Sequence, residues 1–238
     1  MVEEHFFADR DKLIQTLAAR CEAQLLHAID QRGKASLLVS GGSTPAPLYQ
    51  ELSHRTLDWS RVGVGLVDER WVNADHSASN ERFIREHLLF NKARDAAFYP
   101  MKQNGISAQA AAADVAELYQ SKLSWPADLV ILGMGADGHT ASLFPRAEGL
   151  EQGLNPDNPS VCCAINAIRS PVTGEYTERL SLTYATLCRA KELVLLITGS
   201  EKLAVYQAAK TWQNTIDDCP IAALLTDAKV TVSVFWAP

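Results

Sequence analysis

The sequence predicts a single α/β domain, a Rossmann-like three-layer αβα arrangement with a mostly parallel sheet. Short apolar runs alternate with helical patterns along the whole chain, as is typical of parallel sheets covered by helices on both faces. No linker rich in Pro, Gly or Ser divides the sequence, so we expect one domain over residues 1–238. Hydrophobic residues make up 47% of the 238 residues, which is enough to form a sizeable core.

The helices are predicted from hydrophobic periodicity and from residues that suit helix ends. Asp9–Gly33 carries apolar or small side chains at a period of about 3.6, and its first and last residues suit the two caps. Ser107–Leu123 is rich in Ala, which has the highest helix propensity. A further helix follows Pro45, which suits a first helical turn. The remaining helices are predicted over Ser79–Phe90 and from about Glu201 to Ala209.

Apolar runs of strand length lie between these helices, and none reaches the roughly 18–20 residues of a membrane-spanning helix. We predict strands over Ala35–Ser40, Val62–Val67, Ala97–Met101, Asp128–Leu132, Val161–Asn166, Arg179–Thr183, Leu193–Thr198 and Val230–Trp236. In open parallel sheets, ligands bind beyond the carboxyl ends of the strands. The residues that follow each strand are therefore the best candidates for a functional site.

Charge, the N-terminal sequence and the Cys content indicate which partners and which compartment the protein has. With 22 basic and 28 acidic residues the formal charge is −6, which disfavours non-specific binding of nucleic acid. The N-terminal stretch has acidic residues and no apolar segment, unlike a signal peptide. Five Cys without a C-x-x-C pair fit free thiols in a reducing compartment. We expect a cytoplasmic protein, a monomer or weak homo-oligomer, that binds neither nucleic acid nor membranes.

Four of the predicted strands end in chemically rich segments. These are Gly41–Thr44, Asp68–Arg70, Gly133–His139 and Gly199–Lys202. Because the carboxyl ends of parallel strands lie at one edge of a sheet, we expect the four segments to converge. This convergence is stronger evidence for a site than any single segment.

The first segment is a glycine-rich turn before a helix. Two glycines permit close backbone approach, and free N–H groups with two hydroxyls suit an anion. The alternative is a plain turn in which the Ser or the Thr is the helix N-cap. The residues concerned are Gly41, Gly42, Ser43 and Thr44.

Two cations follow other strands. Arg70 offers a bidentate guanidinium and Lys202 a compact ammonium, and both suit a phosphate monoester. Each of them alone also fits an exposed surface charge. Beside the glycine-rich turn, phosphate binding is the better interpretation.

The segment Gly133–His139 matches G-x-G-x-x-G after a strand. A dinucleotide site needs a long helix that begins in the motif and an acid about 20 residues later, whereas here Pro145 and an Asn/Pro-rich stretch follow. We therefore expect the glycines to shape a tight loop that presents His139. Histidine suits general base catalysis at neutral pH, and Asp137 is placed to orient it or to stabilise its protonated form. A structural loop histidine is the alternative.

Other chemical signatures are absent. The sequence has no G-x-S-x-G, no H-E-x-x-H and no G-x-x-x-x-G-K-[ST], so serine hydrolase, zincin and P-loop chemistry are disfavoured. No group of residues has the spacing of a dedicated metal site. We expect neither a cofactor nor a catalytic metal.

Five stretches spread over most of the chain form a recognisable set. They are LLVSGGSTP at Leu37–Pro45, VDERWV at Val67–Val72 with Ser79-Asn80, GMGADGHTASLFP at Gly133–Pro145, ERLSLTY at Glu178–Tyr184 and GSEKL at Gly199–Leu203. In this order the sequence resembles the 6-phosphogluconolactonase family. The resemblance implies the fold of a superfamily that includes glucosamine-6-phosphate deaminases and ribose-5-phosphate isomerases.

The resemblance implies hydrolysis of 6-phospho-D-glucono-1,5-lactone to 6-phosphogluconate, the second step of the oxidative pentose phosphate pathway. It implies that His139 activates the attacking water, with Asp137 beside it. Arg70 and Lys202 would hold the 6-phosphate, and Arg179 would contact substrate or developing negative charge. The implied substrate-binding residues are Gly41, Gly42, Ser43, Thr44, Asp68, Arg70, Gly135, Arg179 and Lys202.

Two alternatives stay open. The first is an aminosugar-phosphate deaminase or isomerase of the same superfamily, with Asp68 or Asp137 as base, and the second is a non-catalytic sugar-phosphate sensor. Deaminases typically continue their Gly-His with Phe-Asn-Glu and have Tyr after the Asp-Glu pair, whereas this chain has Thr140–Pro145 and Arg70. Both differences favour the lactonase. One departure from the family's pattern is the longer segment at residues 168–176.

Overall fold

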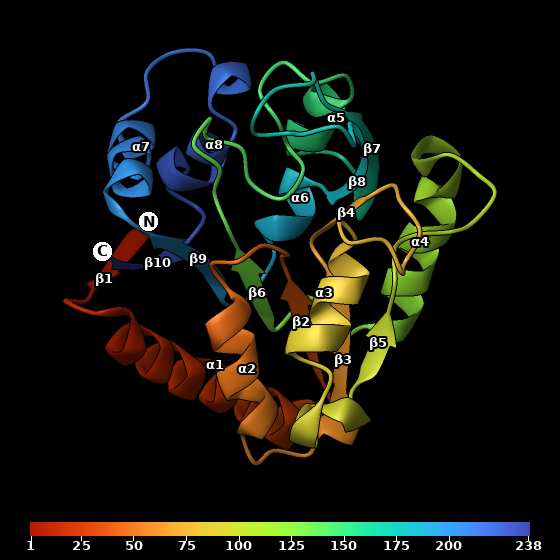
Figure 1. The fold of residues 1–238 in the computed structure, drawn as a ribbon, viewed down its shortest axis with the longest axis vertical. Helices are drawn as coiled ribbons and strands as arrows, with labels where there is room; N and C mark the ends of the chain where they lie inside the picture. The colour runs from red at the N-terminus through yellow and green to blue at the C-terminus, as the bar shows by residue number, and fades with distance from the viewer.

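The computed structural model describes all residues, 1–238, and a parallel sheet of seven strands lies at its centre. The strands are β1 (Val2–Phe6), β2 (Ala35–Val39), β3 (Val62–Leu66), β5 (Ala97–Tyr99), β6 (Leu129–Leu132), β9 (Leu193–Thr198) and β10 (Val232–Ala237). Their order in the sheet is β1-β10-β9-β6-β2-β3-β5, and every neighbouring pair is parallel. The first and the last strand therefore lie side by side, close to the labels N and C in Figure 1.

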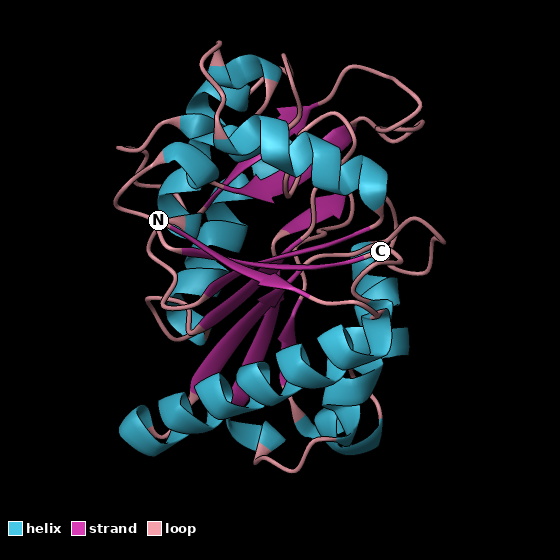
Figure 2. Cartoon of the chain, turned by 90° about the vertical axis from the view of Figure 1, so that its left-hand side faces the viewer, coloured by secondary structure: helices cyan, strands magenta, loops and turns pink.

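Helices lie on both sides of this sheet, as Figure 2 shows. The α-helices are α1 (Arg10–Arg32), α2 (Ala46–His54), α3 (Asn80–His87), α4 (Ala108–Lys122), α5 (Leu150–Leu154), α6 (Tyr184–Leu187), α7 (Ser200–Lys210) and α8 (Ile221–Thr226). Short 3-10 helices occur at η1 (Trp59–Arg61), η2 (Asn91–Asp95) and η3 (Ile216–Asp218). None of the helices combines the length and apolar character needed to cross a bilayer. The predicted α/β fold with a mostly parallel sheet is confirmed.

The predicted caps of α1 are confirmed, and two further helices have serine caps that were not predicted. The Asp9 side chain accepts a hydrogen bond from the N–H of Lys12, and Gly33 ends α1 in the left-handed region at φ 76°. The hydroxyls of Ser79 and Ser107 accept equivalent bonds at the starts of α3 and α4. Short polar side chains thus satisfy backbone N–H groups that have no partner inside the helix.

The predicted N-cap of α2 is wrong. The helix begins at Ala46, is preceded by Pro45, and has no side-chain cap. Residues 42–45 form a turn that begins with Gly42 at φ 103°. This turn places the hydroxyls of Ser43 and Thr44 before the helix, where they do not accept from its first N–H groups.

A second sheet, antiparallel and of three strands, was predicted only in part. It consists of β4 (Asp68–Arg70), β8 (Glu178–Leu182) and β7 (Cys162–Asn166), in that order. The sequence analysis treated residues 68–70 as the end of a parallel strand, because Asp-Glu-Arg has no apolar residue to indicate β structure. In the fold they pair with β8, so that Asp68 faces Ser181 and Arg70 faces Arg179.

Two apolar clusters support these sheets. The larger contains 57 buried residues and includes four of the five residues of β2, all but the polar Ser36. The smaller contains seven residues next to the second sheet: Leu143, Phe144, Ala147, Leu150, Cys163, Ile165 and Ala167. Leu143, Phe144 and Ala147 belong to the chain that leaves the Gly133–His139 loop, so this smaller cluster anchors that chain.

Buried polar contacts join β2 and β6 at the amino edge of the parallel sheet. The Asp128 carboxylate accepts the N–H of Ser36 at 2.9 Å, and the Ser36 hydroxyl donates to the carbonyl of Ser124 at 2.8 Å. Asp128 also pairs with Arg32 and, at 3.4 Å, with Lys191. Since the Asp128 side chain has no exposed surface, these partners replace its lost hydration.

Replacing Asp128 by Ala should destabilise the chain by about 2–4 kcal/mol, because a buried N–H loses its acceptor. Urea denaturation measures this change. The control is Asp95→Ala, whose side chain is 66% exposed and whose loss should cost less than about 0.5 kcal/mol. Equal unfolding midpoints for the two variants would contradict the role of Asp128.

Candidate active site

Four adjacent strands, β9, β6, β2 and β3, end in the segments that the sequence analysis singled out. Because these strands are parallel neighbours, the segments that follow them lie at the same edge of the sheet. Residues far apart in the sequence are brought to this edge by the strand order alone.

The loop after β6 folds tightly around its glycines. The Gly135 N–H donates to the carbonyl of His139 at 2.9 Å, and the Gly138 N–H donates to the carbonyl of Gly135 at 3.1 Å. A Cβ atom at Gly135 would lie 2.1 Å from Nδ1 of His139, so only glycine fits there. No helix begins in the motif, in agreement with the prediction that these glycines shape a loop.

His139 and Asp137 form a hydrogen-bonded pair. Nδ1 of His139 lies 2.5 Å from Oδ1 of Asp137, which also accepts the His139 backbone N–H at 3.1 Å. The side chains are 19% and 26% exposed. Donation from Nδ1 to a carboxylate assigns the proton of the neutral ring to Nδ1 and leaves the lone pair on Nε2. Nε2 makes no hydrogen bond within the protein, so it is free to accept a proton.

The surroundings of Asp137 keep it ionised. Burial raises the pKa of Asp137, but the hydrogen bond and the charge of His139 lower it more, and the resulting pKa lies below the ordinary value. An ionised carboxylate is the form that stabilises a protonated imidazole. The pair is therefore suited to general base catalysis at Nε2.

Arg70 is held in place with part of its guanidinium free. Nη1 donates to the carbonyl of Ala78 at 2.8 Å, while the buried Nε makes no hydrogen bond within the protein. Nη2 also makes no hydrogen bond within the protein, so it can donate a charge-assisted hydrogen bond to a phosphate or a carboxylate. The predicted contact of Arg70 with the phosphate stays a prediction.

Glu69, next to Arg70, was missed by the sequence analysis. Its carboxylate has no exposed surface and accepts four hydrogen bonds: from the N–H groups of Arg70, Asn80 and Glu81 and from the hydroxyl of Ser79. Burial raises the pKa of Glu69 to about 7, although these backbone donors act in the opposite direction. Glu69 therefore joins β4 to the N-terminus of α3, and the Ser-Asn pair that begins α3 was the signal available in the sequence.

Asp68 lies inside the protein rather than open to a ligand. Its side chain accepts from the hydroxyl of Ser142 at 2.5 Å and from Nδ2 of Asn80 at 3.3 Å. Asp68 is 6% exposed, and a Cβ atom at Gly41 would lie 1.9 Å from Oδ1 of Asn80. Asp68 and Asn80 thus connect the loops after β2, β3 and β6, and the predicted substrate contact of Asp68 stays a prediction.

Arg179 is also largely occupied. Its Nε donates to the carbonyl of Tyr176 at 2.6 Å and its Nη2 to the carbonyl of Thr173 at 2.8 Å. Burial lowers the pKa of Arg179 to about 10, Asp68 opposes this shift and the charge of Arg70 adds to it. The guanidinium supports residues 173–176, and its predicted contact with substrate stays a prediction.

Lys202 and the glycine-rich turn are less constrained. Lys202, in the first turn of α7, is half-buried, makes no ion pair or hydrogen bond, and has a pKa that burial lowers. In the turn, the Ser43 and Thr44 side chains also make no hydrogen bond within the protein. These groups are free to bind an anion, but no contact joins Lys202 to His139 or Arg70.

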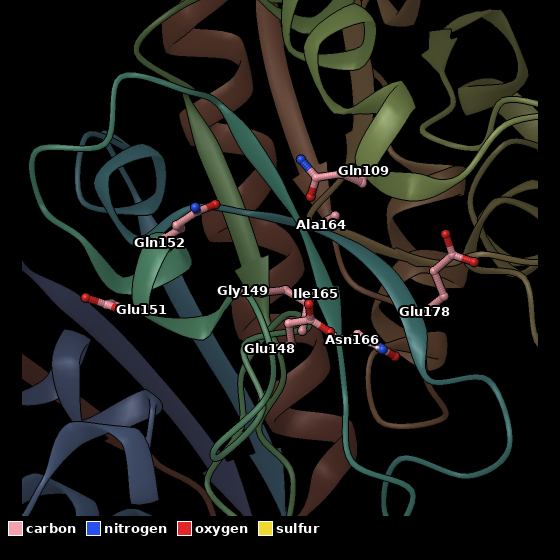
Figure 3. A pocket seen from close by; sticks show the side chains of 9 residues that line it. All are labelled: Gln109, Glu148, Gly149, Glu151, Gln152, Ala164, Ile165, Asn166 and Glu178. Carbon is pink, nitrogen blue, oxygen red and sulfur yellow. Dashed lines mark hydrogen bonds between the residues drawn. The ribbon is translucent and has the colours of Figure 1, made fainter.

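A separate pocket of about 540 Å³ lies between α4, α5 and β7, as Figure 3 shows. Its lining includes Glu148, Glu151 and Glu178, and none of the predicted site residues. Three carboxylates and no basic side chain make it unsuited to a phosphate. No group of three or more His, Cys, Asp or Glu side chains is arranged to hold a metal ion.

Comparison with known proteins identifies the family. The family described as glucosamine-6-phosphate isomerases/6-phosphogluconolactonase matches residues 8–236. The chain belongs to this family. A curated relative named 6-phosphogluconolactonase, from Rhizobium meliloti (strain 1021), is 42% identical over 234 residues, which cover 98% of each chain. The resemblance drawn from the five sequence stretches is therefore confirmed.

Solved structures agree with this family membership. A 6-phosphogluconolactonase from Shewanella baltica OS155 superposes with a TM-score of 0.93 at 41% identity, over 100% of this chain and 98% of that one. A monomeric glucosamine-6-phosphate deaminase has a TM-score of 0.73 at 22% identity, over 98% of this chain and 96% of that one, and shows a shared fold alone. This chain and that deaminase thus have a common fold.

We expect Asp137→Asn to reduce stability at neutral pH, and the loss to shrink below about pH 4. The folded-state pKa of Asp137 is lowered, so its stabilisation is fully present above the ordinary pKa and disappears as pH falls through the lowered one. Thermal unfolding of both chains from pH 7 to pH 3 measures this. Asp95→Asn is the control, and a loss in Asp137→Asn that stays constant with pH would contradict the expectation.

Proposed function

We propose that the chain hydrolyses 6-phospho-D-glucono-1,5-lactone to 6-phosphogluconate, with His139 as the general base. The observation that carries the proposal is the His139–Asp137 pair, whose Nε2 is free at the sheet edge where Arg70 and Lys202 also lie. The names of the curated relatives, which are 35–42% identical over nearly the full length, support the substrate.

The chemistry requires one proton to move twice. Nε2 of His139 takes a proton from water as the water oxygen attacks C1 of the lactone, and the ionised Asp137 stabilises the imidazolium that forms. The tetrahedral intermediate then breaks its C1–O5 bond. The imidazolium returns the proton to the O5 alkoxide, which leaves a carboxylic acid, a free hydroxyl group and the neutral base.

The cations supply binding at the other end of the substrate. Nη2 of Arg70, which makes no hydrogen bond within the protein, donates to the 6-phosphate, and Lys202 adds a point charge. The turn at residues 41–44 offers hydroxyls and N–H groups beside them. Holding the phosphate fixes C1 relative to Nε2, so that binding energy remote from C1 lowers the entropy cost of the reaction.

The deaminase alternative is less well supported. An aminosugar-phosphate isomerase or deaminase needs a free carboxylate base, and Asp68 and Asp137 already accept hydrogen bonds from Ser142 and His139. The discriminating experiment measures acid release from freshly prepared lactone above the spontaneous rate, and ammonia release from glucosamine 6-phosphate. Ammonia release without accelerated lactone hydrolysis would replace the proposal with the deaminase alternative. If the chain catalyses neither reaction, a non-catalytic binding protein is the better interpretation.

We also propose that residues 1–238 are one domain of a cytoplasmic protein that is a monomer or weak homo-oligomer and binds no nucleic acid. One continuous core of 57 residues supports the single domain. Five free Cys support a reducing compartment, and the net charge of −6 disfavours polyanions.

We predict that His139→Gln lowers kcat by about 10²–10⁴-fold and leaves KM nearly unchanged, because general base catalysis is lost while the phosphate contacts remain. Initial rates of acid release, corrected for spontaneous hydrolysis, measure this. His27→Gln, an exposed change on α1, should behave like the unaltered chain. Near-normal turnover of His139→Gln would remove His139 from its proposed role.

We predict that Lys202→Met raises KM by about tenfold or more with little change in kcat, since a charge-assisted contact to the phosphate is lost. The affinity for 6-phosphogluconate, measured by calorimetry, should fall as KM rises. Lys210→Met is the matched control, because Lys210 is on the same helix and pairs with Glu4. If Lys202→Met and Lys210→Met bind 6-phosphogluconate equally well, the proposed contact between Lys202 and the phosphate is wrong.

A further inference from the structure

The aromatic side chain beside the catalytic pair is Phe144. Its ring centroid lies 4.1 Å from that of His139, with the two planes tilted by 31°. The guanidinium carbon of Arg179 lies over the same ring, 5.3 Å from its centroid. Phe144 is therefore in contact with both the general base and the buried arginine of β8.

Phe144 is itself held firmly. It is 3% exposed and belongs to the seven-residue apolar cluster next to the second sheet, with Leu143 and Leu150. Its backbone carbonyl accepts the N–H of Ala147 at 3.2 Å, and the Leu143 N–H donates to the carbonyl of Thr140 at 2.9 Å. A ring anchored in this way can define the position of a neighbouring side chain, whereas a surface ring cannot.

We infer that Phe144 is a positioning residue for His139, which fixes the plane of the imidazole and stabilises its protonated form. The inference rests on the proposed function. Asp137 holds Nδ1, but a single hydrogen bond leaves the ring free to rotate about that contact. The packing of Phe144 against the ring removes this freedom and keeps Nε2 directed at one point, as efficient proton transfer requires.

The electrostatic effect of the Phe144 ring on His139 also favours general base catalysis. The imidazolium formed during catalysis lies against the negative face of an aromatic ring, an arrangement that favours the cation. Near His139, Asp137 lies on the same loop, Cys219 packs against Gly138, and the Arg179 guanidinium lies over the Phe144 ring. Asp68 bonds to Ser142 farther along the chain. Among these groups only Asp137 touches the imidazole directly.

The test compares Phe144→Leu with Phe235→Leu. Phe235, 1% exposed on β10, stacks on His5 at 4.6 Å, and the guanidinium carbon of Arg20 lies 5.8 Å from its ring centroid, so it reproduces the His–Phe–Arg contact on a strand that carries none of the predicted site residues. Phe144→Leu should lower kcat on the order of tenfold with KM unchanged. Phe235→Leu should lose comparable thermal stability and keep kcat.

A second readout does not depend on activity. In an NMR titration of the histidine rings, the His139 signal is the one absent from His139→Gln. Its midpoint should move to lower pH by about half a unit in Phe144→Leu, because a contact that favours the imidazolium is lost. Phe144→Tyr, which keeps the aromatic face, should restore both the midpoint and kcat. If Phe144→Leu does not fold, Phe144→Met replaces it, since Met fills a similar volume without an aromatic ring.

The outcomes separate the two levels of inference. An unaltered chain without lactonase activity would overturn the proposed function. If the unaltered chain is active and Phe144→Leu keeps its kcat and its His139 midpoint, the role of Phe144 is wrong while the lactonase stands. If kcat falls but the midpoint stays and Phe144→Tyr gives no rescue, Phe144 only supports the fold, and the positioning role is also wrong.

Discussion

Two neighbouring carboxylates, Asp68 and Glu69, hold together the loops on which the candidate site is built. They alternate along β4, so each turns to a different set of donors. Glu69 accepts from the start of α3, and Asp68 accepts from Asn80 and from Ser142, which follows the Gly133–His139 loop. Each carboxylate costs free energy to bury, and only the hydrogen bonds offset that cost. Because their donors come from separate segments, the strands must be assembled before either carboxylate is satisfied, and the position of each loop depends on the others.

The same strand explains how positive charge is tolerated at the site. Arg70 on β4 lies directly opposite Arg179 on β8, an arrangement that like charges disfavour. Carbonyl oxygens of Ala78, Tyr176 and Thr173 accept from the two guanidinium groups, and the acids of β4 lie beside them. The fold itself therefore holds both guanidinium groups in place. Under the proposed function, a phosphate dianion would meet Arg70 already oriented, which reduces the entropy cost of binding.

Sequence reasoning predicted the features that local chemistry determines. The parallel sheet, the ends of α1 and the tight loop at residues 133–139 follow from periodicity, capping and glycine. It missed β1 and β4, whose residues are mostly polar, and the short helices α5, α6 and α8, which depend on tertiary packing. The family resemblance also implies substrate contacts of Asp68 and Arg179, and these stay predictions. Their partners are Ser142, on a distant loop, and carbonyl oxygens of residues 173 and 176, and no pattern along one strand encodes such contacts.

The pairing of β1 with β10 bears on the order in which the chain folds during synthesis. Val2–Phe6 is synthesised well before its partner, Val232–Ala237, because most of the described chain lies between the two strands. The inner strands have neighbours that emerge earlier, whereas β1 must wait with its amide groups in water. A strand of strong apolar character would be at risk of aggregation during that delay. The sequence Val-Glu-Glu-His-Phe, with its two adjacent acids, keeps the segment hydrated until the sheet edge that receives it has formed.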